Sequence, residues 1–357
     1  RHTRYPLVTG VQTCALRSIV GSLSEGVVIT DPEGKIRLAN QSFMGMFGLP
    51  DLPLGQTLLE SIRLPEVARA VDETLSERKG RGIEIRRVSV DTPESKIFSV
   101  HFAPIVEGNG ELSGVVSVFY DQSKVRHLEN VRTEFIANLS HELRTPLSIL
   151  AGYLETMEEP SVLKGEGGKK ILGTLRRNCE RLTLLVNDLL ELSRIESGQT
   201  NLHPCPRTPL EILEEVEEDW KRAFAAKKVR FKIQCGKDLP KVLSDPLRTG
   251  QIFSNLLENA LRFAPPGSLV TVGANRAENG RMIEFSVQDE GEGIPREKLD
   301  RIFERFFRVE ADRAREKGGT GLGLSIVKHL VQLHGGSVKA VSDLGAGTKV
   351  IVSLCVV

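Results

Sequence analysis

The chain has 357 residues, of which 40% are hydrophobic and 27% are charged, and its formal net charge is +1. This length exceeds one ordinary core, so we expect two or three domains. The small net charge gives no global electrostatic reason to bind nucleic acid. No run approaches the roughly 18 to 20 apolar residues that cross a bilayer. Five scattered cysteines without a CxxC pair favour neither a disulfide framework nor a zinc site, so we expect a reducing, cytoplasmic location.

Residues 1–18 stand apart from the rest of the chain. The first residue is Arg1 rather than Met, so we expect a fragment of a longer reading frame, and the sequence leaves open a membrane anchor upstream. The stretch "VTGVQTCALRS" (Val8 to Ser18) resembles the translation of a sequencing-library adapter, which usually continues with Pro-Ile where this chain has Arg17 and Ser18. We therefore interpret residues 1–18 as a non-native segment.

Short β-type runs separated by turns fill residues 19–120. "GVVIT", "DPEG" and "KIRLAN" predict a β-hairpin, a short helix is expected from Gln41 to Phe47, and "IFSVHFAPIV" with "LSGVVSVFY" predicts a second hairpin. This pattern indicates a small α+β domain. The phrase "SLSEGVVITDPEGKIRLANQSFMGMFGL" resembles a PAS sensor domain. The alternative for this segment is a packing or dimerisation module without a ligand.

Residues 121–198 have helical periodicity. Asp121 or Ser123 can cap a first helix. An apolar stripe with spacings of three or four follows at Leu128, Val131, Phe135, Leu139 and Leu143. His141 lies about 200° around the helix from Leu139, so we expect an exposed histidine on a packed helix.

A second helix is predicted from Gly168 to Glu196. Its heptad seam comprises Leu172, Leu175, Cys179, Leu182, Val186 and Leu189. The next seam position is Ser193, and we expect Leu192 to take over the packing there. The two helices predict an antiparallel hairpin. One hairpin leaves both apolar stripes uncovered, so we expect a homodimer in which two chains form a four-helix bundle.

Residues 199–208 form a proline-broken linker, and residues 209–357 alternate strands and helices as a separate α/β domain. The predicted strands are "VRFKIQC", "LVTVGANR", "MIEFSVQDE", "SVKAVSD" and "TKVIVSL". Three glycine-bearing stretches accompany them: "DEGEGI", "GGTGLGLSIVK" and "GAGT". The second leads directly into a helix, whose free amides suit a phosphate group.

"NLLENALRF" places Asn255, Asn259 and Arg262 at spacings of four and three, on one face of a helix. Carboxamide oxygens can hold Mg²⁺ and its waters, while an arginine can bind phosphate. The alternative, a solvated helix face, explains poorly why Asp289 and three glycine stretches follow in order. We therefore expect Asn255 and Asn259 to be the metal-binding residues of a nucleotide site.

These motifs together resemble a sensor histidine kinase of the two-component type over residues 121–357. Its sequence boxes appear in order as "SHELRTP", "NLLENALRF", "DEGEGI", "FERFFR", "GGTGLGL" and "GAGT". The resemblance implies an α+β PAS domain, a helical-hairpin dimerisation domain, and an α/β sandwich ATP-binding domain of the GHKL (Bergerat) type. With "EFIANLSHELRTPLSILAGYLETM" and "DLLELSRIESG", the chain most resembles the phosphate-regulon sensor kinases.

The resemblance also implies roles for individual residues. His141 would accept a phosphoryl group from Mg-ATP and pass it to an aspartate of a response regulator. Asp289 would bind the adenine amino group, Arg262 and Arg305 would neutralise phosphate charge, and residues 308–318 would form a mobile lid. The implied nucleotide-binding residues are Asn255, Asn259, Arg262, Asp289, Gly291, Gly293, Arg305, Gly319, Gly321, Leu322, Gly323 and Thr348.

The residues around His141 fit this chemistry. Neutral imidazole can attack phosphorus through one nitrogen if an acceptor holds the other N–H, and Glu142 is placed to be that acceptor. Thr145 lies one turn beyond His141, and the motif implies that it orients water for the reverse, dephosphorylating reaction. Pro146 removes the helical partner of the Glu142 carbonyl, so we expect it to bend the helix there.

Two rival readings remain open at this stage. Related ATPases of the gyrase type carry a water-activating glutamate where this chain has Asn255, which favours transfer to a protein nucleophile over hydrolysis. One rival is an enzyme that works mainly as a phosphatase of its regulator. The other is a non-catalytic, dimeric ATP-binding scaffold.

Overall fold

A computed structural model describes residues 20–88, 95–157, 166–278, 280–309 and 319–357. The chain divides into two compact units, with the boundary between Glu134 and Phe135. Within the described ranges, no helix has the length and apolar character needed to cross a membrane. The expected adapter-like segment, residues 1–18, lies outside the described residues.

The first unit contains one antiparallel five-stranded sheet with the strand order β2-β1-β5-β4-β3. The strands are β1 (Gly26–Thr30), β2 (Ile36–Ala39), β3 (Arg81–Val88), β4 (Ser95–Val106) and β5 (Leu112–Asp121). Both predicted hairpins are confirmed, because β1 pairs with β2 and β4 pairs with β5. Strand β3, on the edge beside β4, was not anticipated by the sequence analysis.

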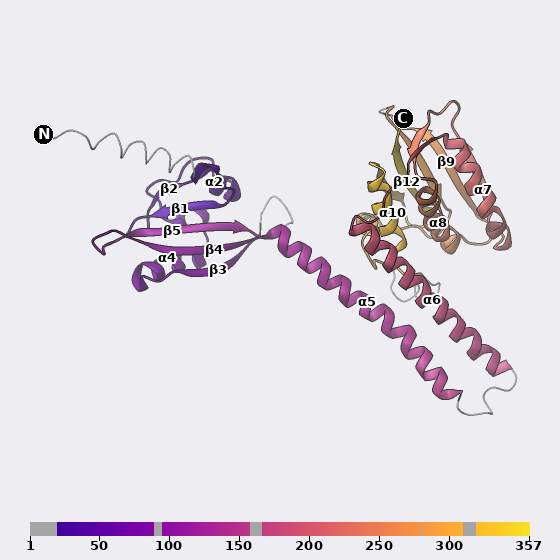
Figure 1. Ribbon diagram of the computed structural model, residues 1–357, viewed down its shortest axis with the longest axis horizontal. Coiled ribbons are helices and arrows are strands. Elements are labelled where there is room, and N and C mark those ends of the chain that lie inside the picture. The colour runs from indigo at the N-terminus through magenta and orange to yellow at the C-terminus, as the bar shows by residue number, and fades with distance from the viewer. Residues whose placement is uncertain (1–19, 89–94, 158–165, 279, 310–318) are drawn as a thin grey trace. The chain divides into compact units, whose positions relative to one another are not determined.

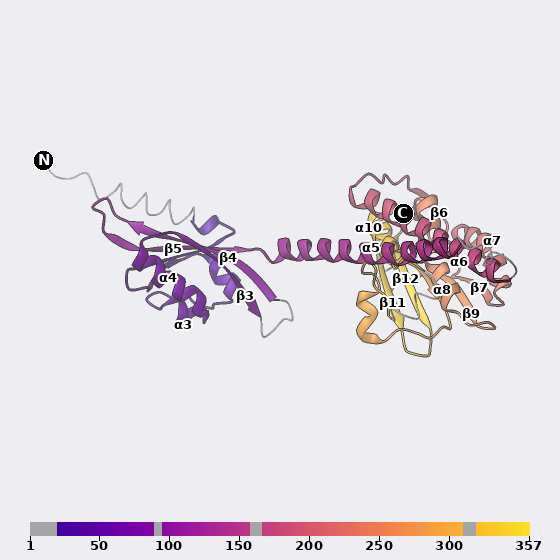
Figure 2. The same ribbon diagram turned by 90° about the horizontal axis from the view of Figure 1, so that it is seen from below.

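Three helices accompany this sheet, namely α2 (Gln41–Phe47), α3 (Leu58–Ile62) and α4 (Pro65–Glu77) (Figures 1 and 2). The predicted Gln41–Phe47 helix is confirmed, and the Asn40 side chain caps it by accepting from the Phe43 N–H. Phe43, Phe47 and Phe119 lie with ring centroids 4.9 to 5.4 Å apart in the core. This unit is the expected small α+β domain.

Helices α5 (Ser123–Thr156) and α6 (Glu166–Glu196) form the helical hairpin (Figure 1). The Asp121 carboxylate accepts from the Ser123 N–H at the start of α5, as expected for a cap. Glu142 of α5 and Arg181 of α6 form an ion pair of 2.7 Å. Helix α5 continues through Pro146, which is buried.

The α/β domain of the second unit has a five-stranded sheet with the order β11-β12-β10-β9-β7. Its strands are β7 (Arg230–Cys235), β9 (Leu269–Arg276), β10 (Met282–Gln288), β11 (Ser337–Ser342) and β12 (Thr348–Cys355). All five were predicted. The pairing of β7 with β9 is parallel, and the other three pairings are antiparallel. A separate pair, β6 (Cys205–Arg207) with β8 (Val242–Ser244), was not anticipated.

Helices α7 (Pro209–Ala226), α8 (Pro246–Phe263) and α10 (Gly323–Leu333) pack against this sheet (Figure 2). The 3₁₀ helix η1 (Arg296–Arg301) follows β10 in the chain. Their apolar faces share one core with the sheet, to which α6 contributes Leu192 and Ile195. The expected packing role of Leu192 is confirmed, since it is 1% exposed. The end of α6 is therefore anchored to the α/β domain.

Candidate nucleotide and phosphoacceptor site

Helix α8 presents three of the predicted residues on one face. Its N-terminus is capped by Asp245, and most of its apolar residues face the core, while Asn255, Asn259 and Arg262 lie half-buried on another side. The Asn255 amide donates to the Gln251 carbonyl at 3.2 Å, and Arg262 Nη1 donates to Asn259 Oδ1 at 3.3 Å. Burial lowers the pKa of the Arg262 guanidinium, against the attraction of Glu258 and Asp188.

The Gly319–Gly323 loop lies directly against these side chains. A Cβ atom at Gly319 would lie 2.4 Å from Arg262 Nη1, and one at Gly323 would lie 3.0 Å from Asn255 Oδ1. Gly319 also has a φ of +128°, which L side chains rarely adopt. Because the loop lacks side chains at these points, its backbone can approach a phosphate group at the start of α10.

Gly321 and Leu322 belong to the same loop. Gly321 has a φ of +77°, and a Cβ there would lie 3.0 Å from Phe306 Cα. Its carbonyl accepts from the Phe306 N–H at 2.9 Å. Leu322 is completely buried, precedes α10 and donates its N–H to the Thr320 hydroxyl at 3.2 Å. Leu322 therefore anchors the loop.

Asp289 lies just beyond β10, in a setting that fixes its carboxylate. Asp289 Oδ1 accepts from the Gly291 N–H at 2.8 Å and from the Thr348 N–H at 3.3 Å. A Cβ at Gly291 would lie 2.7 Å from the same oxygen. Burial raises the pKa of Asp289, and hydrogen bonds from the backbone of Gly291, Thr348 and Asp289 itself oppose that shift. The result is an oriented, half-buried carboxylate.

The second glycine of this turn packs against another loop. Gly293 has a φ of +72°, and a Cβ there would lie 2.2 Å from the Asp343 carbonyl oxygen. The Gly345 N–H donates to the Glu292 carbonyl at 2.7 Å. The "DEGEGI" and "GAGT" stretches are thus joined by backbone contacts.

The residues around His141 lie on α5. His141 is exposed, as predicted, and its carbonyl accepts from the Thr145 hydroxyl at 3.2 Å. Glu142 Oε2 accepts from Arg181 at 2.7 Å and from Arg308 at 2.9 Å. Arg308 also donates to the Gly319 carbonyl at 2.6 Å. Glu142 is therefore connected through one arginine to the glycine loop.

Arg305 contacts residues of both helices of the hairpin. It pairs with Glu196 of α6, and its guanidinium lies 5.2 Å from the ring centroid of Phe135 on α5. The structure thus brings together Asn255, Asn259, Arg262 and the glycine loop, while Arg305 contacts the helical hairpin. Of the expected lid, residues 310–318 lie outside the described residues.

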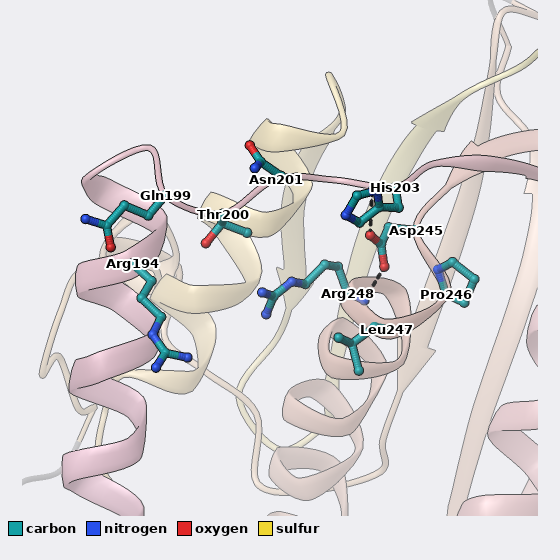
Figure 3. A pocket seen from close by; sticks show the side chains of 9 residues that line it. All are labelled: Arg194, Gln199, Thr200, Asn201, His203, Asp245, Pro246, Leu247 and Arg248. Carbon is teal, nitrogen blue, oxygen red and sulfur yellow. Dashed lines mark hydrogen bonds between the residues drawn. The ribbon is translucent and has the colours of Figure 1, made fainter.

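A pocket lies where the helical hairpin leads into the α/β domain, between the end of α6 and the start of α8 (Figure 3). Asp245 accepts there from the backbone N–H groups of His203 and Arg248. The residues that line the pocket include none of the predicted site residues. Its contacts fix the start of α8.

Comparisons with known proteins agree with this geometry. Three family models match: a histidine kinase-, DNA gyrase B- and HSP90-like ATPase over residues 244–357, a His Kinase A (phospho-acceptor) domain over residues 131–198, and a PAS domain over residues 15–79. A sensor protein kinase WalK of Staphylococcus aureus is 32% identical over 348 residues, which cover 95% of this chain and 80% of the relative. The chain belongs to the sensor histidine kinase family.

Other relatives define the extent of the match. WalK of S. aureus strain Newman is 32% identical over 95% of this chain and 55% of its own length, and WalK of Staphylococcus saprophyticus is 31% identical over 95% and 54%. The chain spans a little over half the length of these two curated relatives. A likeness to the phosphate-regulon subfamily of sensor histidine kinases is not confirmed, since these relatives are WalK proteins.

A solved structure shows the same fold. The crystal structure of histidine kinase ThkA in complex with response regulator protein TrrA matches with a TM-score of 0.54 and 21% identity, covering 95% of this chain and 98% of that chain. The expected multidomain fold class is confirmed for this member of the sensor histidine kinase family.

Sequence reasoning missed several contacts of this sensor kinase. Thr320, between two of the predicted glycines, donates to Asp188 of α6 at 2.6 Å. Arg181 and Arg308 bind Glu142, and Arg248 binds Glu191. The only hint of these contacts in the sequence was the set of acidic residues on α6 between its buried positions. A fully solvated helix face would show the same pattern, so the pattern did not indicate contacts.

Proposed function

We propose that the chain is a protein-histidine kinase that transfers the γ-phosphoryl group of ATP to His141. The arrangement of Asn255, Asn259 and Arg262 against the Gly319–Gly323 loop carries this proposal. A glycine loop with bare amides at the start of α10, facing carboxamides and an arginine, suits a bound triphosphate. The fixed Asp289 carboxylate can accept a hydrogen bond from the adenine amino group.

The residues fit a magnesium ion as well. Asn255 uses its amide to bind the Gln251 carbonyl, so its oxygen is oriented toward Gly323 and the start of α10. Carboxamide oxygens together with phosphate oxygens and waters are typical Mg²⁺ ligands. When bound, the metal neutralises charge on the phosphates. In this proposal Asn255 and Asn259 hold the metal and Arg262 binds a phosphate oxygen.

His141 supplies the nucleophile. The lone pair of one imidazole nitrogen forms the new N–P bond, and ADP departs with the electrons of the broken P–O bond. The proton on the other ring nitrogen passes to the Glu142 carboxylate, which must exchange its bonds with Arg181 and Arg308 to receive it. The exposure of His141 permits both the approach of ATP and that of a partner.

The proposed partners are a second copy of the chain and a response regulator. Exposed apolar residues along the helical hairpin, such as Leu128 at 67% and Leu172 at 55%, support a four-helix bundle between two copies. The regulator's receiver domain would dock beside His141 and take the phosphoryl group on an aspartate. ATP and such receivers are cytoplasmic, so this portion of the protein would work in the cytoplasm.

Incubation with γ-labelled Mg-ATP tests the kinase. A histidine kinase gains label that acid removes and base preserves, because the N–P bond is acid-labile. A scaffold that only binds ATP gains no covalent label. Label that survives acid, or no label at all in a protein that binds ATP, would contradict the proposal.

A second function shares the same residues. Thr145 lies one helical turn from exposed His141, where its hydroxyl could orient water toward a regulator's aspartyl phosphate. We therefore propose a regulator phosphatase activity beside the kinase activity. Dephosphorylation of a purified, phosphorylated regulator by the chain measures it directly.

A further inference from the structure

The last three turns of α6 carry acidic side chains that face the α/β domain. Asp188 Oδ2 accepts from the Thr320 hydroxyl at 2.6 Å, Glu191 pairs with Arg248, and Glu196 pairs with Arg305. The Glu196 and Arg305 side chains are 34% and 26% exposed, so their ion pair is partly shielded from water. Helix α6 therefore docks on the α/β domain through carboxylates as well as through Leu192 and Ile195.

Two of these carboxylates face the arginines assigned to nucleotide phosphates. Asp188 is bound to Thr320, and Thr320 follows Gly319, which lies against the Arg262 guanidinium. The electrostatic attraction between Asp188 and Arg262 opposes the effect that burial has on the pKa of each group. Glu196 binds Arg305 directly. One helix thus supplies negative charge to both arginines.

A carboxylate and a phosphate make the same demands on such arginines. Each is an anion that needs N–H or O–H donors, and charge interactions strengthen where water is excluded. Once a carboxylate satisfies an arginine, an incoming phosphate must displace it or share the positive charge. The cost of that displacement appears as weaker nucleotide binding.

We propose that Asp188 and Glu196 compete with the nucleotide phosphates for Arg262 and Arg305, so that docking of α6 opposes the binding of Mg-ATP. This inference rests on the proposed function, which assigns Arg262 to phosphate, and on the family resemblance, which implies the same role for Arg305. By linkage, the nucleotide must also weaken the docking of α6 by the same factor. Binding of Mg-ATP therefore weakens the docking of the α/β domain on α6, which favours movement of the nucleotide toward His141.

Titration calorimetry of the full chain with Mg²⁺ and a non-transferable ATP analogue tests the competition. Asp188→Asn keeps an oxygen that can accept from Thr320 and removes only the charge, and Glu196→Gln does the same opposite Arg305. Each variant should bind the analogue about 3- to 10-fold more tightly than the wild type, from the loss of one charge interaction. The double variant should bind more tightly than either single variant.

Glu180→Gln is the matched control. Glu180 lies on α6 and pairs with Arg176 of the same helix at 2.9 Å, so its loss removes one charge from α6 without touching the α/β domain. We expect wild-type affinity from this control and cooperative thermal unfolding from all variants, which shows that each is folded. Tightening by Glu180→Gln to the same degree would overturn the proposal, because a diffuse effect of helix charge would then explain the result.

The outcomes also separate this inference from the function on which it rests. If the wild type binds the analogue and Asp188→Asn and Glu196→Gln bind it equally or more weakly, the competition is wrong and the kinase proposal stands. Weaker binding by Asp188→Asn would mean that the carboxylate holds the glycine loop in its binding form. If the wild type binds no nucleotide at all, both the proposed function and the competition fail.

Discussion

The α/β domain buries most of its apolar residues within one chain, whereas the helical hairpin leaves many of its apolar residues exposed. Helix α8 alone contributes five buried apolar residues to a core that the sheet, two further helices and the end of α6 complete. In the described part of α6, the apolar positions that reach the interior are Leu185, Leu192 and Ile195, while Leu172, Leu184 and Leu190 are each more than half exposed. The apolar core of the α/β domain is therefore complete within a single chain, and the apolar packing of the helical hairpin is not.

This difference separates what each region can do alone. The proposed nucleotide site needs only residues of the α/β domain, whose loops are fixed by backbone contacts such as those of Asp289 with Gly291 and Thr348. The proposed phosphoacceptor lies on a helix whose apolar stripe, in this proposal, is covered only by a second copy of the chain. Binding of ATP should therefore survive changes that abolish transfer or dimerisation.

His141→Gln should separate the two regions most completely. The nucleophile lies on the helical hairpin and the nucleotide site in the α/β domain, so we expect autophosphorylation to fall to background while affinity for Mg-ATP and dimerisation stay near wild type. Transfer from labelled ATP and calorimetry on the same preparation measure both. His127→Gln, which changes an exposed histidine on the same helix, should keep full labelling. Stable phosphohistidine in His141→Gln would mean that another histidine is the acceptor.

Much of this division could be predicted from the sequence. The strands of the α/β domain and helix Gln41–Phe47 follow from alternation and turn residues, because their side chains are sorted by a core within the same domain. Strands β3, β6 and β8 and helices α3 and α4 were not predicted. The very short pairing of β6 with β8 spans three residues in each strand, too few for a periodic signal.

The candidate site could be predicted only as separate motifs. The spacing of Asn255, Asn259 and Arg262 places them on one helix face, and local chemistry sufficed for that. The contacts of Glu142 with Arg181 and Arg308 join positions 39 and 166 residues apart. No local sequence pattern predicts such ion pairs, because acidic and basic residues that form them cannot be distinguished in sequence from those that face solvent.

Asn259→Asp should weaken the binding and use of Mg-ATP by the α/β domain. A carboxylate in place of the carboxamide adds negative charge beside the phosphates, and it turns the neutral acceptor that Arg262 uses at 3.3 Å into an anion that competes with the phosphates for Arg262. We expect Mg-ATP affinity and autophosphorylation to fall together by about tenfold or more. Calorimetry and labelling at several Mg²⁺ concentrations measure the effect. Normal turnover at ordinary Mg²⁺ would remove Asn259 from the site.

Leu172→Glu should weaken dimerisation through the helical hairpin. Leu172 is a predicted seam position and is 55% exposed in the single chain, so a dimer would bury it and a charge would oppose that burial. Loss of one buried leucine per chain should weaken the dimer by roughly 10- to 100-fold. Sedimentation over a concentration series measures dissociation. Leu247→Glu, at a leucine of the α/β domain that is 74% exposed, should dimerise normally; equal dimerisation of both variants would place the interface elsewhere.

Thr145→Ala tests whether the helical hairpin holds a second activity. The hydroxyl donates within the helix to the His141 carbonyl, and a water that attacks aspartyl phosphate needs an orienting oxygen on this face. Transfer from ATP to imidazole needs no water. We expect autophosphorylation within a few-fold of wild type and regulator dephosphorylation slowed roughly tenfold or more. Thr145→Ser, which keeps the hydroxyl, should retain most of the dephosphorylation rate, and equal rates in all three proteins would defeat the assignment.

The smallest expected effect is a pH dependence that belongs to the α/β domain alone. Burial raises the pKa of Asp289, so its carboxyl gains a proton at a higher pH than an ordinary aspartate does. The proposed bond to the adenine amino group needs the ionised form as an acceptor, and nucleotide affinity should therefore fall several-fold as the pH falls toward this raised pKa. Asp289→Asn cannot ionise and should bind weakly at every pH.

The nucleotide's own phosphates also gain protons as the pH falls, which makes the comparison between the two proteins essential. Calorimetric affinities of wild type and Asp289→Asn, measured with one nucleotide across the same pH series, cancel that shared contribution. The ratio of the two affinities should shrink as the pH falls, because protonation turns the wild-type side chain into a neutral group like the variant's. A ratio that stays constant with pH would show that the Asp289 charge plays no part in binding. His141→Gln should display the wild-type profile, since the titrating group and the nucleophile belong to different regions of the chain.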